Sequence, residues 1–217
     1  MSLHTSPTGT DTVTGIALTA KLDIDHLDVQ FGGLPGNRPA IFGNCLALWR
    51  AGMDPFADLP LLQIPLLQTE AVGSEKIDVF KRLGERGNAS SDGYLVGYCT
   101  GGLLSSVAAT SRSDDSGAAT CCSITVVKQD AVGLLVYWEA LAGHRAASNG
   151  DWVGVWESEQ FAWNRRGLLC RMPVEDDSHQ GRVLAKPLLD AGKRYAVTYA
   201  TGPAATNLAA VVTFTAS

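Results

Sequence analysis

The residues best suited to chemistry are one cysteine, two histidines and an acid. Cys99 lies in the run Gly97–Gly101, where flanking glycines could expose a thiol nucleophile. A thiol needs a base beside it to react efficiently. His26 and His144 are candidate bases, and Asp151 is a candidate acid. These four side chains are the candidates for a cofactor-free catalytic site. The sequence has no GxSxG, HExxH or P-loop motif, and no GxGxxG at a strand-to-helix junction.

The acidic run Glu175–Asp177, with His179 close behind it, could attract a hard cation. It lacks the alternating ligand spacing of a calcium loop, so a solvated turn is the preferred interpretation. Cys121 and Cys122 are adjacent and would point to opposite faces of a strand. Neither a CxxC motif nor a nearby histidine completes a metal site around them. We therefore expect no metal and no cofactor.

Two loops share a Gly-x-Arg pattern and are candidates for ligand binding. One contains Arg38, and the other contains His144 and Arg145. Guanidinium groups in such loops could contact an anionic ligand or an acidic partner. The alternative interpretation is that each arginine ties its loop to a backbone carbonyl.

A second candidate binding surface is the stretch Phe161–Arg166, which combines two aromatic residues with two arginines. Trp163 offers a rigid apolar face, and Arg165 and Arg166 offer directed donors, as in many interface anchors. The corresponding stretch of the first half, Met53–Leu62, is apolar and acidic. The two halves thus differ where a binding surface would differ. The alternative is that these apolar residues pack the two halves together.

The elements that must position these residues occur twice. Residues 27–50 align without a gap on residues 134–157 at a constant offset of 107. A second block, residues 94–109, aligns on residues 195–210 at an offset of 101. Two blocks in the same order indicate two copies of one unit of roughly 100 residues, the usual size of a domain.

We divide the chain into a first copy, residues 10–117, and a second copy, residues 118–217. The alignment pairs Trp49 with Trp156 and Tyr98 with Tyr199. We expect each pair to be buried at equivalent places.

Most segments of each copy alternate apolar and polar residues with a period of two, as half-buried strands do. In the second copy this holds for Ile124–Gln129 and Tyr195–Tyr199. Six or seven short strands per copy, separated by Gly, Asn, Asp and Pro, predict an all-β fold: two tandem immunoglobulin-like antiparallel β-sandwiches. Ser74–Leu83 also fits a short amphipathic helix, but a strand is preferred.

The second copy also contains the pattern Leu-x-x-Gly-x-x-Tyr at Leu189–Tyr195. In immunoglobulin-like domains this tyrosine commonly hydrogen-bonds back across the corner before its strand. Together with Asp151–Trp156 and the following aromatic loop, the pattern resembles the SKICH domain, an immunoglobulin-like module of inositol phosphatases and autophagy adaptors. The resemblance implies a non-catalytic role in targeting and protein interaction.

Composition excludes several classes of function. The net charge is −5, and Lys and Arg are scattered, so we expect no nucleic-acid partner. No apolar run is long enough to span a bilayer. Residues 1–14 lack a secretory signal pattern, so we expect a cytoplasmic protein. The Ala-, Gly- and Asp-rich composition is typical of bacterial proteins.

The five cysteines do not form a framework common to both copies. Cys45 aligns with Trp152, and Cys99 aligns with Ala200. We therefore expect reduced thiols. A Cys45–Cys99 bridge is the most plausible exception, since both lie on predicted central strands.

These observations favour a non-enzymatic binding protein. Its ligand would be a protein, a glycan or a small anionic molecule, held by the sandwich-end loops or the inter-domain cleft. Homo-oligomerisation is compatible with the sequence. The alternative is a cofactor-free enzyme with a site in the inter-domain cleft.

Overall fold

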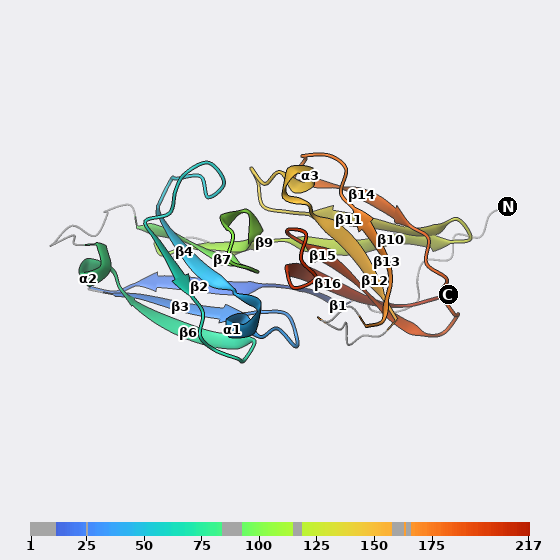
Figure 1. Cartoon of the computed structure of the whole chain (residues 1–217), viewed down its shortest axis with the longest axis horizontal. Helices are drawn as coiled ribbons and strands as arrows, with labels where there is room; N and C mark the ends of the chain where they lie inside the picture. Colours follow the sequence, from blue (N-terminus) through green and yellow to red (C-terminus); the bar gives the residue numbers. More distant parts are fainter. Residues whose placement is uncertain (1–11, 25, 84–92, 115–118, 158–162, 164–165) are drawn as a thin grey trace. The chain divides into compact units, whose positions relative to one another are not determined.

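The computed structural model describes residues 12–24, 26–83, 93–114, 119–157, 163 and 166–217. These residues form two compact units, each a sandwich of two antiparallel sheets (Figure 1). The predicted all-β class, with tandem immunoglobulin-like sandwiches, is confirmed. Within the described residues, unit 2 covers 16–121 and 141–144, and unit 1 covers 12–15, 122–140 and 145–217.

Unit 2 consists mainly of the first copy. Its smaller sheet has the strand order β2 (Ala17–Leu22), β3 (His26–Gly32), β6 (Val72–Asp78). Its larger sheet has the order β5 (Leu62–Pro65), β4 (Cys45–Arg50), β7 (Tyr94–Cys99), β8 (Val107–Arg112), β9 (Thr120–Cys121). Three short helical segments join these strands: α1 (Pro39–Phe42), α2 (Val79–Leu83) and η1 (Leu104–Ser106).

Unit 1 has the same arrangement. Its smaller sheet has the order β10 (Ser123–Asp130), β11 (Gly133–Glu139), β14 (Gln180–Ala185). Its larger sheet has the order β13 (Leu168–Pro173), β12 (Trp152–Trp156), β15 (Arg194–Ala200), β16 (Leu208–Thr215), β1 (Thr12–Gly15). The helix α3 (Ala146–Asn149) precedes β12, as α1 precedes β4.

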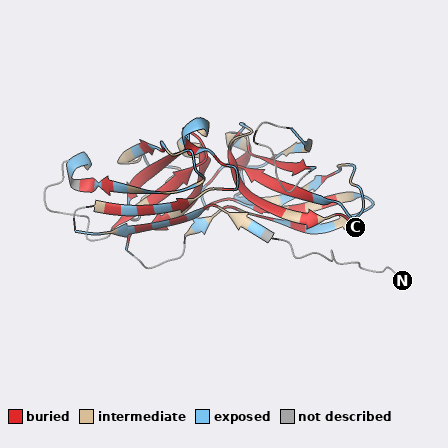
Figure 2. Cartoon of the chain, turned by 90° about the horizontal axis from the view of Figure 1, so that it is seen from below, coloured by how far each residue is buried: buried red, intermediate tan, exposed pale blue. Residues whose placement is uncertain are grey.

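Alternation of side chains explains where each core lies. In β3, Leu27, Val29 and Phe31 are buried, while Asp28 and Gln30 between them are exposed. Burial of one strand face against the opposite sheet is the main source of stability in such sandwiches. Figure 2 shows the buried residues running along the central strands of both units.

The strand registers agree with the internal repeat. Leu46 lies opposite Tyr98 in unit 2, and Val153 lies opposite Tyr199 in unit 1. Each tyrosine is followed by a register shift against the next strand. The four aromatic residues predicted to be equivalent, Trp49, Trp156, Tyr98 and Tyr199, are all buried.

Two local predictions can be compared with the structure. The backbone N–H of Asp190 donates to Tyr195 Oη at 2.9 Å, so the predicted tyrosine corner forms in the second copy. The ambiguous stretch Ser74–Leu83 divides between both interpretations: β6 ends at Asp78, and α2 begins at Val79. The Asp78 carboxylate accepts the backbone N–H of Lys81 at 2.8 Å, which stabilises the first turn of α2.

The first strand of each copy pairs with the last strand of the other copy. β1 precedes β2 in the chain but pairs with β16, where Val13 lies opposite Val212. β9 precedes β10 but pairs with β8, where Thr120 lies opposite Thr110. The two compact units therefore differ from the proposed division into residues 10–117 and 118–217 by these exchanged strands and by residues 141–144.

The exchange predicts a crossed effect of proline substitution. Val13→Pro removes a backbone N–H from β1. We therefore expect faster amide hydrogen exchange in β16 of unit 1 and an unchanged exchange rate in β8 of unit 2. Losing one or two hydrogen bonds, at about 1 kcal/mol each, should accelerate exchange roughly tenfold. Hydrogen–deuterium exchange with mass spectrometry measures this. The control Thr120→Pro should affect β8 and spare β16; the opposite pattern would contradict the exchange.

Trp156 is a second test of the fold, because its indole is buried and its Nε1 donates to Thr198 Oγ1 at 2.8 Å. Trp156→Ala should lower the free energy of unfolding by about 3–5 kcal/mol, as other large aromatic truncations do. Chemical denaturation measures the loss. Leu188→Ala is a control in the same unit, since Leu188 is 96% exposed. Equal effects of the two substitutions would mean that burial of Trp156 does not stabilise unit 1.

Candidate functional site

Three loops meet at one end of each sandwich, which we call the loop end. In unit 2 the β3–β4 loop bonds the β5–β6 loop through Ala40 N–H to Gln68 O at 2.9 Å. Gln63 Nε2 donates to Gly102 O of the β7–β8 turn at 2.9 Å. In unit 1, Ala147 N–H donates to Asp176 O at 3.1 Å. Loops fixed to a rigid scaffold in this way are where immunoglobulin-like domains usually carry binding residues.

A buried tyrosine hydroxyl fixes the loop end of unit 2. Tyr98 Oη accepts Asn37 Nδ2 at 2.8 Å and Asn44 Nδ2 at 2.7 Å. Asn44 Nδ2 also donates to Asn37 Oδ1 at 3.1 Å. All three side chains are buried, and the Tyr98 ring packs on Phe31, 5.6 Å between centroids. The network joins the inner face of β7 to both ends of the β3–β4 loop.

The same positions in the second copy contain the candidate catalytic residues His144 and Asp151. At the repeat offset of 107, His144 corresponds to Asn37 and Asp151 to Asn44. Tyr199 Oη donates to Asp151 Oδ2, and Trp138 stacks on the Tyr199 ring at 5.2 Å. Asp151 therefore has the structural place of an asparagine. His144, also buried, lies 5.2 Å from Phe56 between ring centroids, within unit 2.

Burial shifts the ionisation of both tyrosines. Desolvation raises the pKa of Tyr98 to about 12, against the lowering effect of the amides of Asn44 and Asn37. Desolvation also raises the pKa of Tyr199, and the neighbouring Asp151 charge raises it further. Both phenols stay protonated at neutral pH, so they act as fixed hydrogen-bonding groups.

The candidate nucleophile Cys99 is not placed beside a base. It is fully buried at the end of β7, and its pKa is raised first by its hydrogen bond with Cys45 and then by burial. His26 begins β3, whereas Cys99 lies at the loop end, where β3 finishes. Seven strand residues separate these ends by roughly 20 Å. His26 Nε2 instead lies 3.3 Å from Asp28 Oδ2 and 3.7 Å from Asp23 Oδ2.

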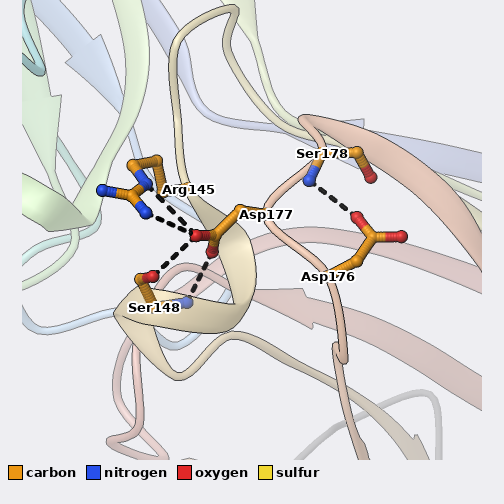
Figure 3. A network of polar contacts seen from close by, with 5 residues as sticks. All are labelled: Arg145, Ser148, Asp176, Asp177 and Ser178. Carbon is orange, nitrogen blue, oxygen red and sulfur yellow. Dashed lines mark hydrogen bonds and ion pairs between the residues drawn. The ribbon is translucent and has the colours of Figure 1, made fainter.

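Arg145 joins a network of polar contacts that also includes Asp177 and Ser148 (Figure 3). Its Nη2 and Nε donate to Asp177 Oδ2 at 2.9 and 3.1 Å. Ser148 donates to the same carboxylate through its backbone N–H and its hydroxyl, both at 2.7 Å. The arginine ties its loop to a carboxylate rather than to a backbone carbonyl. An anionic ligand at Arg145 would have to displace Asp177.

The surroundings of Arg38 differ from those of Arg145. Its backbone carbonyl accepts the N–H groups of Ile41 and Phe42 at 2.9 and 3.0 Å and so begins α1. Its side chain is exposed. The loop alignment that pairs Gln68 with Asp176 puts Thr69 in the place of Asp177. The ion pair of the second copy thus has no carboxylate counterpart at that position of the first.

Beside the loop end of unit 1 is a groove of about 400 Å³. Its walls come from the end of β13 and the following loop (Met172–Val174) and from β14 (Gly181–Leu184), with Trp138 between them. A Cβ on Gly181 would lie 2.9 Å from Trp138 Cζ2, so only glycine lets the indole pack against β14. Glu175 and Asp176 lie at the rim and are exposed.

Hydrogen bonds favour the charged forms of two aspartates beside the groove. Hydrogen bonds from the Ser178 hydroxyl and backbone lower the pKa of Asp176. The Ser148 hydroxyl and backbone, together with Arg145, lower the pKa of Asp177. The interpretation of Glu175–Asp177 as a solvated turn did not predict that Asp176 and Asp177 accept hydrogen bonds that hold the neighbouring loops in place. The signal was present in Ser148 and Ser178, but only the fold shows which carboxylates they reach.

The other predicted binding residues lie only partly within the described chain. Trp163 is half-buried and Arg166 is exposed. Phe161 and Arg165 lie outside the described residues. In the corresponding loop of the first copy, Trp49 Nε1 donates to Asp58 O at 3.0 Å, so that loop covers the outer face of β4.

Two broader features concern the described residues as a whole. No group of three or more His, Cys, Asp or Glu side chains among them is arranged to hold a metal ion. None of the helices in this part of the chain has the length and apolar character that crossing a membrane requires.

Comparisons with known proteins identify no family. No family model matches the chain, and no curated protein matches it. Among solved structures, the crystal structure of the chicken CNTN1 FN1–FN3 domains is similar over 95% of this chain and 66% of that chain, just under two thirds of it. The sequence identity is 13% and the TM-score is 0.27. The class of the protein, a tandem pair of immunoglobulin-like sandwiches, therefore follows from its own strand order and registers.

The tyrosine networks predict a loss of stability at high pH. The pKa of Tyr98 rises from about 10 when unfolded to about 12 when folded, so its contribution is complete below about pH 10 and disappears as pH rises through about 12. This difference in pKa contributes roughly 3 kcal/mol to the free energy of unfolding below about pH 10. Urea unfolding across this pH range, combined with phenolate absorbance, measures the effect.

Tyr98→Phe is the control for this prediction, since it should remove the Tyr98 part of the pH dependence, leaving that of Tyr199, regardless of its effect on stability at neutral pH. Ionisation of all five tyrosines near pH 10 in a chain that remains folded would contradict it.

Proposed function

We propose that the protein is a non-enzymatic interaction module and that the groove beside Trp138 in unit 1 binds an extended segment of a partner protein. The observation that supports this most is the position of the groove between two strands that each end a sheet. β13 is the last strand of the larger sheet, and β14 is the last strand of the smaller one.

An edge strand offers backbone N–H and C=O groups to an incoming strand. β14 has β11 as its hydrogen-bonded neighbour in the described sheet, on one side only. Its residues alternate between exposed and half-buried from Gln180 to Leu184, without a proline or lysine to discourage pairing. A partner strand can add to this edge while its alternate side chains enter the groove.

The lining of the groove indicates the chemistry of the partner. Met172, Val174 and Leu184 supply apolar surface, and Leu184 is 43% exposed. Glu175 and Asp176 place negative charge at the rim. The complementary segment carries an aliphatic or aromatic side chain next to a lysine or arginine, because such a pair matches both features.

Several observations favour binding over catalysis. Cys99 and His26 lie at opposite ends of β-strands in unit 2, and Asp151 is bonded to Tyr199. His144 and Asp151 occupy the positions of two asparagines that stabilise a loop. The alternative of an enzyme with an inter-domain site is correspondingly less supported.

The finer expectations from sequence remain proposals of the same kind. They are a glycan or small anionic ligand at Arg38, His144, Arg145 or the Phe161–Arg166 surface, the relation to SKICH domains, a bacterial source, a cytoplasmic location and a homo-oligomer. Arg182, which also lines the groove, is the residue that an anionic ligand would use there.

The proposal is tested by selecting peptides on the full chain from a phage-displayed library of short random sequences. Enriched peptides should carry a basic residue beside an apolar one. The double variant Glu175→Gln, Asp176→Asn should weaken their binding about 2- to 30-fold by fluorescence anisotropy, since each exposed charge contributes about 0.2–1 kcal/mol. Added salt should weaken it as well.

Glu70→Gln is the matched control, because Glu70 lies in the corresponding β5–β6 loop of the first copy and is exposed. Equal affinities of the double variant and the control would contradict this site. A loss of binding in Arg182→Ala alone would point instead to an anionic ligand.

A further inference from the structure

Cys45 and Cys99 form a pair of thiols on the outer face of the larger sheet of unit 2. They lie directly opposite each other on β4 and β7. Tyr98, the neighbour of Cys99, points into the sandwich, where it packs on Phe31. Adjacent strand residues point to opposite faces, so Cys99 and its partner Cys45 point away from the core. We propose that these two thiols are a redox modification site, at which a hydroperoxide converts them reversibly to a disulfide.

Strand geometry already satisfies the requirements of the bond. Directly opposite residues of antiparallel strands have Cα atoms about 4.5–5.5 Å apart. A disulfide needs Cα atoms about 4.4–6.8 Å apart and Cβ atoms that point the same way. Both cysteines are free thiols, and their side chains hydrogen-bond to each other. Closing the bridge therefore needs no rearrangement of the strands.

The surroundings give the two thiols different roles. Gln63 Nε2 donates to Cys45 Sγ at 3.2 Å, and Cys45 Sγ lies 3.6 Å from Gly101 O. The hydrogen bond from Cys99 and then that from Gln63 lower the pKa of Cys45, against the effect of burial. The pKa of Cys99 is raised by the same thiol contact and by burial. Because the Gln63 amide donates to Cys45 Sγ and so stabilises negative charge on that sulfur, Cys45 is the attacking thiolate, and Cys99 is the thiol that resolves the intermediate.

Access to Cys45 requires local movement, and Gln63 is one side chain that can supply it. Both cysteines are buried, but Gln63, which hydrogen-bonds Cys45, is exposed. Rotation of a surface glutamine side chain takes place on the picosecond-to-nanosecond timescale. Displacement of this side chain gives the oxidant a route toward Cys45 from the outer face of the sheet.

The chemistry balances with hydrogen peroxide as the oxidant. The Cys45 thiolate attacks one peroxide oxygen, an S–O bond forms, the O–O bond breaks, and the departing hydroxide takes up a proton to become water. This leaves Cys45 as a sulfenic acid. The Cys99 sulfur then attacks the Cys45 sulfur, the S–S bond forms, and the S–O bond breaks. The second hydroxide leaves as water with the Cys99 proton, and a dithiol reductant reverses the two-electron oxidation.

The pair is not a requirement of the fold. The equivalent residues of the second copy are Trp152 and Ala200, which lie opposite each other in the same register. Three other cysteines serve as internal references. Burial raises the pKa of Cys121 and of Cys170, both of which are half-buried, and Cys122 is buried.

The test treats the folded full chain with hydrogen peroxide, blocks the remaining thiols by rapid alkylation in denaturant, and maps the peptides by mass spectrometry. We expect a Cys45–Cys99 disulfide to form about tenfold faster than Cys121 or Cys170 is oxidised, since a lowered pKa raises the thiolate fraction more than it lowers nucleophilicity. Dithiothreitol should restore both thiols. Oxidation of Cys45 no faster than that of Cys121 and Cys170, or bridging to another cysteine, would overturn the proposal.

Two variants separate the roles. Cys99→Ala introduces the residue of the second copy, so it should fold. Cys45 should then accumulate as a sulfenic acid that dimedone traps, at a lower rate than in the unchanged chain because the hydrogen bond from Cys99 is lost. In Cys45→Ser, Cys99 should remain a free thiol under the same treatment. Peroxide-dependent modification of Cys99 in Cys45→Ser at the wild-type rate would show that Cys45 is not the attacking residue.

Discussion

The buried tyrosine hydroxyl on the central strand of each larger sheet is the constraint on which both sandwiches depend. A phenol in an apolar core costs free energy unless its hydroxyl is hydrogen-bonded. Tyr98 meets this requirement with the amides of Asn37 and Asn44, and Tyr199 meets it with the carboxylate of Asp151. In each unit the bond reaches from the core strand to the residue just before the next strand. The loop end is thereby held in place from inside the core.

A second constraint acts on the edges of the larger sheets. β8 and β16 are the last strands of their copies, and each would otherwise end a sheet with unpaired backbone groups. The chain covers them by exchange: β9 pairs with β8, and β1 pairs with β16. Ile16 and Cys122, where the chain passes from one sheet to the other, are both buried. Each unit is therefore completed by a strand that the alignment assigns to the other copy, so the two copies cannot fold with their full sheets independently.

The internal repeat predicted the fold because it rests on buried residues on both faces of the larger sheets. Trp49, Trp156, Tyr98 and Tyr199 recur at fixed offsets because each fills the same place in its sandwich. The strand exchange was not predictable, since Thr12–Gly15 and Thr120–Cys121 are short and carry no residue that specifies a partner strand. Among the candidate catalytic residues, the alignment did contain a signal that sequence analysis missed: His144 and Asp151 replace Asn37 and Asn44. A catalytic acid whose counterpart is a buried asparagine is more simply a hydrogen-bonding group of the core.

The two copies share a scaffold but differ in the residues that line the hollows beside their smaller sheets. Both smaller sheets contain an aromatic residue packed over a glycine of the neighbouring strand, Phe31 over Gly73 and Trp138 over Gly181. In both units the surface beside this pair is hollowed, and in unit 2 its lining is Ala17–Thr19, Gln30–Gly32 and Val72–Ser74. That lining has no acidic or basic residue, whereas the groove of unit 1 has Glu175, Asp176 and Arg182. The scaffold thus places an aromatic residue over a glycine twice, but the hollows beside the two pairs have different walls: β2 and β3 contribute to the hollow of unit 2, and β13 with the loop after it contributes to the groove of unit 1. The charged residues that would give it a specific partner occur once, next to the carboxylate that Arg145 and Ser148 hold in place.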